Sequence, residues 1–106
     1  MLNTRTLMTN NMETRQIIIS GKVQAVGFRN WVKKTCENLS LGGNVRNTVD
    51  MKVEAVITGN KFNLDRFCWL CRRGPLLAKV EDVKIKCVDL KEFGGFNIIY
   101  QWGYIF

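Results

Sequence analysis

The sequence contains no histidine. Histidine is the commonest general base near neutral pH and the commonest metal ligand in proteins. Its absence excludes nucleophile pairs of the Ser–His and Cys–His kinds, because no imidazole is present to take the proton. Any chemistry that this chain performs must therefore depend on positioning and electrostatics.

Long apolar runs are also absent. No stretch approaches the ~18–20 residues that a membrane-spanning helix needs, and residues 1–13 lack the apolar core of a secretory signal. Cysteines are few, and without an export signal we expect reduced, buried thiols in a cytoplasmic protein rather than a disulfide framework. The four cysteines are Cys36, Cys68, Cys71 and Cys87.

Cys68 and Cys71 form a Cys-x-x-Cys pair, which can indicate a redox or zinc site. Both fall late in a predicted helix, whereas a redox thiolate normally sits at a helix N-terminus. A zinc site would have to recruit Cys36 and Cys87, which have no partner at metal-binding spacing. We therefore expect core thiols and no metal.

Acidic residues are scarce, with 9 Asp and Glu against 16 Lys and Arg, and the net charge is +7. Such a balance favours anionic partners: nucleic acid, an anionic membrane surface or a phosphate-bearing substrate, which charge alone does not separate. At 106 residues the chain fits one globular domain with a modest core. We assign residues 1–13 to a flexible tail, residues 14–101 to a single domain and residues 102–106 to an apolar extension.

Hydrophobic periodicity predicts strands and helices in the order β-α-β-β-α-β, followed by a last strand. Helical spacing predicts a helix that starts at Phe28 and ends near Gly42 and a second one with Asn60 or Asn63 as N-cap. In the fourth strand, we expect the side chains of Val83, Ile85 and Cys87, and of Leu90 at its end, to point inward. The predicted ranges are 14–20, 28–41, 43–48, 51–58, 62–71, 80–90 and 96–100. This order predicts an α+β ferredoxin-like sandwich, an antiparallel sheet with two helices on one face.

The stretch from Ser20 to Arg29 joins the first predicted strand to the first predicted helix. A loop at a helix N-terminus presents free N–H groups and partial positive charge. Glycines allow close approach of the backbone, and Arg29 adds a forked donor that is always ionised. These parts favour an anion site, most simply for phosphate. A tight turn beside a solvated arginine is the alternative on these residues alone.

The same stretch, Gly21-x-Val23-Gln24-x-Val26-x-Phe28-Arg29, resembles the signature of the acylphosphatase family. A second block, Gly43-Asn44-Val45-Arg46-Asn47 with Val53-Glu54-Ala55 and Gly59, resembles the family's other signature. Arg73-Gly74-Pro75 with Ala78-x-Val80-Glu81-x-Val83 looks like the end of its second helix and the next strand. The resemblance extends from about residue 15 to residue 100.

The resemblance implies hydrolysis of the carboxyl–phosphate bond of small acyl phosphates by a monomer without metal or cofactor. Inorganic phosphate or sulfate would bind at the same place, and positioning with electrostatics suffices for phosphoryl transfer. Arg29 would hold the phosphate and Asn47 would orient the attacking water, although Asn47 by itself also suits a turn at a strand end. The phosphate-binding loop would consist of Val23, Gln24, Ala25, Val26, Gly27 and Phe28.

Three residues depart from the family pattern: Ala25 and Met51 stand where glycine is usual, and Asn44 where an aromatic is usual. If Ala25 had a positive φ, the loop would be strained. We expect a negative φ there, because the sequence shows nothing that would support such strain.

A catalytically silent anion-binding or RNA-binding module of the same fold is the rival hypothesis. Readers of RNA in this fold class stack bases on exposed sheet aromatics, and the chain has no such aromatic run. We therefore do not expect nucleic acid or a membrane as a partner, and we interpret the remaining basic residues as a solvated face. These residues are Arg72, Arg73, Lys79, Lys84, Lys86 and Lys91.

Overall fold

The computed structural model describes residues 11–100, which form two helices and five strands. The elements are β1 (Met12–Lys22), α2 (Phe28–Asn38), β2 (Gly42–Asn47), β3 (Val53–Asn60), α3 (Lys61–Cys71), β4 (Lys79–Val88) and β5 (Phe96–Ile99). β1 begins earlier than predicted, because Met12 and Glu13 pair with β3, so these two residues belong to the sheet and not to a tail. Asn11 is described too, and its backbone oxygen accepts a hydrogen bond of 2.9 Å from the backbone N–H of Lys61. Residues 1–10 of the predicted tail lie outside the described residues, as does the extension at residues 102–106.

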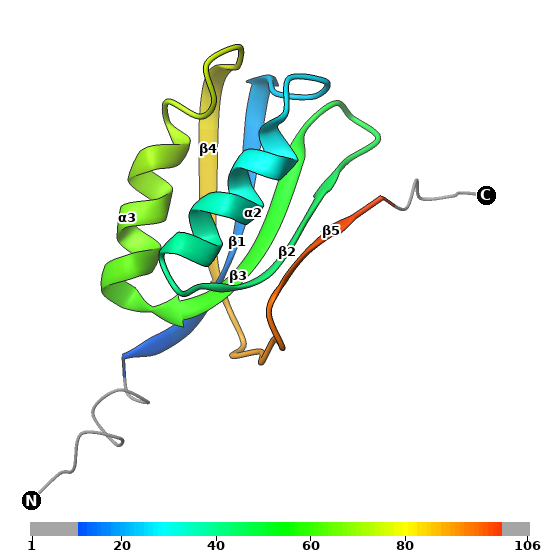
Figure 1. Cartoon of the computed structure of the whole chain (residues 1–106). Coiled ribbons are helices and arrows are strands. Elements are labelled where there is room, and N and C mark those ends of the chain that lie inside the picture. The colour runs from blue at the N-terminus through cyan, green and yellow to red at the C-terminus, as the bar shows by residue number, and fades with distance from the viewer. Residues whose placement is uncertain (1–10, 101–106) are drawn as a thin grey trace, which may run out of the picture.

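The strands form one sheet in the order β4-β1-β3-β2-β5, and both helices cover the same face of it (Figure 1). β1 pairs antiparallel with β3 and β4, and β2 pairs antiparallel with β3. This confirms the predicted ferredoxin-like arrangement of two helices on one face of a sheet. β5 pairs parallel with β2, so the complete sheet is mixed.

The core lies between the sheet and the two helices. Alternation along β1 and β3 turns every second side chain toward the helices, and Ile17, Ile19 and Val53 are fully buried there. Val32 and Cys36 of α2 and Leu64, Phe67 and Cys71 of α3 fill the opposite side. Neither of these described helices is long and apolar enough to cross a membrane.

The prediction for the fourth strand was right for Val83 and wrong for three other residues. Val83 packs against the core, but Ile85 is 49% exposed and Cys87 is exposed as well. Leu90 lies beyond the end of β4 and is also exposed. The cause is position, because β4 is the edge strand beside β1, and its helix-facing side chains lie at the margin of the helix layer. Of the four cysteines, Cys36, Cys68 and Cys71 are buried as predicted.

The two helices begin differently. Asn60 caps α3, because its side-chain oxygen accepts a hydrogen bond of 2.8 Å from the backbone N–H of Asn63. Gly27 precedes α2 with a φ of 78° and offers no side chain to the first turn. The N–H groups at the start of α2 are therefore left for another acceptor.

The loop between β1 and α2 is held in a conformation that the sequence did not predict. Ala25 has a φ of 60°, so the expectation of a negative φ was wrong. Two contacts supply the support that we considered absent. The side-chain amide nitrogen of Gln24 donates to the backbone oxygens of Thr48 and Lys52, at 2.9 Å each, and Phe28 is buried at the other end of the loop.

We predict that Ala25→Gly stabilises the protein. A left-handed alanine costs roughly 1–2 kcal/mol, whereas glycine adds about 0.4–1 kcal/mol of entropy to the unfolded chain. The free energy of unfolding, measured by urea titration, should therefore rise by about 0.5–1 kcal/mol.

Val49→Gly is the matched control, because Val49 is also exposed in a loop but is not among the residues with positive φ. This variant should be less stable than the wild type. If both glycine variants lose stability to the same extent, Ala25 is not strained.

Candidate active site

A cavity of about 120 Å³ opens where the β1–α2 loop approaches the end of β2. This loop and the turn between β2 and β3 lie at the same end of the sheet (Figure 1). Six of the lining residues come from a single segment that runs from the loop into the first turn of α2. Asn47 ends β2, and Tyr100 follows β5. The lining residues are Val23, Ala25, Gly27, Phe28, Arg29, Asn30, Asn47 and Tyr100.

The structure brings together most of the residues that the sequence indicated. Val23, Ala25, Gly27 and Phe28 line the cavity with Arg29 and Asn47. Gln24 and Val26 do not line it: the side chain of Gln24 binds the β2–β3 turn, and Val26 packs against the core. Their side chains thus hold the loop in place.

The cavity is electropositive at the start of α2. The helix dipole places partial positive charge there, and α2 has neither a side-chain cap nor an acidic residue in its first turn. Arg29 lies in this same turn, and no carboxylate of residues 11–100 forms an ion pair with it. Both sources of positive charge remain available to an anion.

Tyr100 is a lining residue that sequence reasoning missed. The guanidinium carbon of Arg29 lies 5.0 Å from the centre of the Tyr100 ring, a cation–π distance. The sequence places Tyr100 only at the end of the last predicted strand. The pairing depends on the parallel register of β5 with β2, which no local pattern in the sequence reveals.

Asn47 lines the cavity and contains an uncommitted acceptor. Its side-chain oxygen is buried, and it has no hydrogen-bond partner within residues 11–100. A buried polar oxygen without a partner is costly, so such an atom often marks a site for a water or ligand. The amide of Gln24 fixes the turn that follows Asn47, so the cavity has a firm wall on this side.

Phe28 anchors the end of the loop in the hydrophobic core. Its side chain is 1% exposed, and its ring packs at the edge of Trp31 with the ring centres 5.4 Å apart. A Cβ atom added to Gly74 would lie 2.6 Å from this ring, so only glycine fits there. The Arg73-Gly74-Pro75 block therefore contributes to the site through packing.

The thiols do not form a second reactive centre. Burial raises the pKa of Cys36, Cys68 and Cys71, so these thiols remain protonated at neutral pH. No group of three potential metal ligands occurs among the described residues. These findings agree with the interpretation of Cys68 and Cys71 as core thiols.

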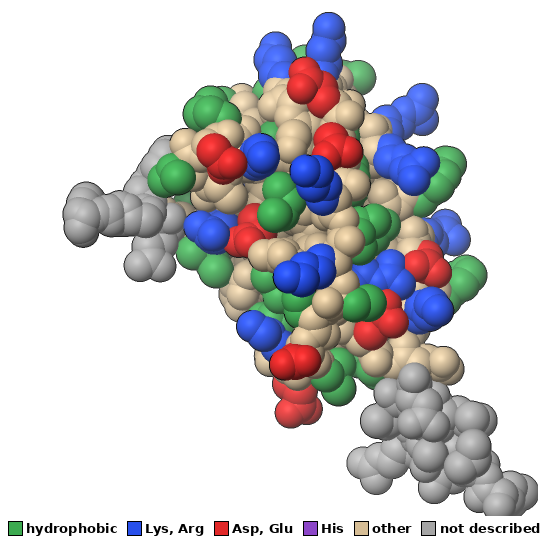
Figure 2. Space-filling view, turned by 180° about the vertical axis from the view of Figure 1, so that it is seen from behind, with side chains coloured by type: hydrophobic (Ala, Val, Ile, Leu, Met, Phe, Trp, Pro, Cys, Tyr) green, Lys and Arg blue, Asp and Glu red, His purple; other side chains and the backbone are tan. Residues whose placement is uncertain are grey.

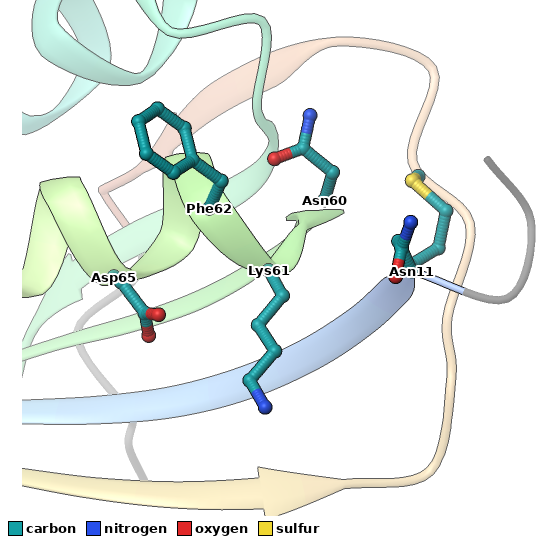
Figure 3. Close-up of a pocket in the computed structure, with 6 residues that line it drawn as sticks. Asn11, Asn60, Lys61, Phe62 and Asp65 are labelled. Carbon is teal, nitrogen blue, oxygen red and sulfur yellow. The ribbon is translucent and has the colours of Figure 1, made fainter. Parts of the chain in front are cut away.

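A larger hollow of about 510 Å³ lies at the start of α3 (Figure 3). Asn11, Lys61, Phe62 and Asp65 are among its lining residues. The backbone N–H of Asn63 is already capped by Asn60, and the carboxylate of Asp65 is paired with Arg15 at 2.8 Å. This hollow therefore lacks the uncommitted donors and acceptor of the cavity beside Arg29.

Comparison with known proteins finds acylphosphatases as relatives of this chain. A family model described as Acylphosphatase matches residues 15–98. An acylphosphatase of Methanocella arvoryzae is 34% identical over 87 residues, which are 82% of this chain and 99% of the relative. An acylphosphatase of Rhodopseudomonas palustris is 46% identical over 69 residues, 65% of this chain and 70% of the relative.

A solved acylphosphatase from Coxiella burnetii superposes with a TM-score of 0.85 at 30% identity. The match covers 89% of this chain and 99% of that one. The matches to the Methanocella and Coxiella proteins extend over 99% of each relative. The chain belongs to the acylphosphatase family, hydrolases that act on acyl phosphates.

Proposed function

We propose that Arg29 and the residues of the β1–α2 loop bind the phosphoryl group of a small acyl phosphate, and that Asn47 orients the attacking water. The water oxygen attacks phosphorus, the bond between phosphorus and the acyl oxygen breaks, and a carboxylate leaves. The water gives up its protons to a phosphate oxygen and to solvent. The products are a carboxylate and inorganic phosphate.

One observation carries this proposal: Arg29 and Asn47 line the same small cavity, and among residues 11–100 Arg29 has no ion-pair partner and the Asn47 oxygen no hydrogen-bond partner. The arginine fork and the N–H groups of α2 suit the charge that spreads over the phosphoryl oxygens in the transition state. These donors are fixed before the substrate arrives, so they need no reorganisation during the reaction.

The amide of Asn47 is too weak a base to remove a proton from water. Its oxygen accepts a hydrogen bond, and a water held in this way turns a lone pair toward phosphorus. This is sufficient because a carboxylate is a good leaving group and the transition state is largely dissociative. The missing histidine is therefore no obstacle to this reaction.

The simplest test is hydrolysis of a small acyl phosphate by the pure protein, with Arg29→Gln as the inactive control. Phosphate binding without hydrolysis would favour the silent anion-binding module instead.

An RNA-binding role has little support in the described strands. Phe96 is their only aromatic residue, and it is buried rather than exposed for stacking.

Arg29→Lys should lower kcat/KM for a small acyl phosphate by about 10²–10³, because lysine keeps the charge but loses the fork. The Ki of inorganic phosphate should rise as well. Arg66→Lys, the same substitution at an exposed position of α3, should leave both constants unchanged. Turnover near that of the wild type in Arg29→Lys would contradict the assignment.

Asn47→Ala should lower kcat by about 10² with little change in the Ki of phosphate, because the lost group orients water. The variant should be at least as stable to urea as the wild type, since it removes a buried oxygen that has no hydrogen-bond partner in the described part of the chain. A loss of stability that accompanies the loss of kcat would indicate a structural role for Asn47.

Activity should survive a strong chelator and alkylation of the cysteine thiols under native conditions, and kcat should change little between pH 6 and 8. Only Cys87 is exposed, so mass spectrometry should find a single modified thiol on Cys87. The raised pKa values of the buried cysteines keep them protonated across this range. A chelator-sensitive activity, or a steep pH dependence in this window, would reveal a group that the proposal omits.

A further inference from the structure

Helix α3 is apolar on two opposite sides. Leu64, Phe67 and Cys71 face the core and are fully buried. On the outer side, Phe62 is 72% exposed and Trp69 is 70% exposed. A surface helix normally presents polar residues to water, so the outer side of α3 has the character of a contact surface.

Exposed apolar residues and arginines share the outer side of α3. Phe62, Arg66 and Trp69 are spaced by four and three residues, which places them on one face of the helix, and Arg73 lines a hollow together with Trp69 just after the helix ends. Beyond the helix, the loop to β4 adds two exposed leucines. We call these residues together the α3 surface; they are Phe62, Arg66, Trp69, Arg73, Leu76 and Leu77.

The α3 surface is positively charged. No carboxylate among the described residues forms an ion pair with Arg66, Arg72 or Arg73. The neighbouring Asp65 is already bound to Arg15 at 2.8 Å. On the open face of the sheet, by contrast, acidic and basic side chains are interspersed (Figure 2).

Charge decides between the possible occupants of this surface. A second copy of the chain would bring arginines against the same arginines, so self-association here is unfavourable. The partner must be anionic and must also accept protruding apolar side chains. Leu76 is 96% exposed, Phe62 72% and Leu77 68%, so these side chains stand out from the surface.

A bilayer accepts protruding apolar groups without a complementary pocket, whereas a folded acidic protein needs one. Tryptophan favours the headgroup region, and basic residues are attracted to anionic leaflets. We propose that the α3 surface binds peripherally to the headgroup region of an anionic lipid bilayer. This inference revises the expectation that the chain has no membrane partner, which rested on the absence of a spanning segment.

The helical part of the α3 surface lies away from the active site, because α3 is on the far side of α2 from β5, the strand that Tyr100 follows (Figure 1). The loop with Leu76 and Leu77 lies at the same end of the sheet as the β1–α2 loop (Figure 1). The proposal is independent of the catalytic roles of Arg29 and Asn47, because it uses none of the residues that line the cavity.

The test is co-sedimentation of the full chain with phosphatidylcholine vesicles that contain about one third phosphatidylglycerol, and with pure phosphatidylcholine vesicles. We expect binding to the first and little to the second. Each basic residue near an anionic leaflet strengthens binding about fivefold, so Arg66→Gln/Arg73→Gln should weaken it about 25-fold. Leu76→Ser/Leu77→Ser should weaken it about tenfold or more.

Lys84→Gln/Lys86→Gln is the matched control, because it removes the same charge from exposed positions of β4. This variant should bind as the wild type does. If both charge variants bind the anionic vesicles equally weakly, net charge alone explains the binding, and the proposal is overturned. Absence of binding to anionic vesicles would also overturn it and would leave an acidic protein as the partner to seek.

Discussion

The site depends on the two hydrogen bonds from the Gln24 amide to the backbone oxygens of Thr48 and Lys52. They join the β1–α2 loop to the β2–β3 turn, two segments that are far apart along the chain but lie at the same end of the sheet. Because of this tether, the loop keeps a left-handed alanine, and the end of β2 keeps Asn47 at the cavity. The anchor of Phe28 against Gly74 fixes the other end of the loop.

Around this fixed loop, the groups that would perform the chemistry are those that lack partners. The N–H groups of α2 have no cap, Arg29 has no carboxylate among the described residues, and the Asn47 oxygen has no donor there. α3 begins with a satisfied cap, so the fold is able to complete a helix start and does not do so at α2. Uncommitted groups cost stability, and active sites are where such costs occur.

The position of an element in the fold explains the differences along the sheet. β1 and β3 lie in the middle, and their alternating residues are buried as the pattern predicts. β4 has a similar alternation, yet Ile85 and Cys87 remain exposed because the helix layer does not cover the edge. α3 is the outer helix on this side of the sheet (Figure 1). No element in the described part of the chain covers its outer side.

The sequence by itself determined the order of the elements, the buried faces of the central strands, a cap of α3 at Asn60 or Asn63 and an anion-binding role open to Arg29. These follow from local rules: side-chain period, capping chemistry, and the types of residue at a strand–helix junction. The role open to Asn47 came from the resemblance to a family signature. Tertiary structure alone decided the sign of φ at Ala25, the parallel pairing of β5 and the placement of Tyr100 beside Arg29. Each of these depends on contacts between segments distant in sequence, such as the Gln24 tether, and local propensity contains no information about such contacts.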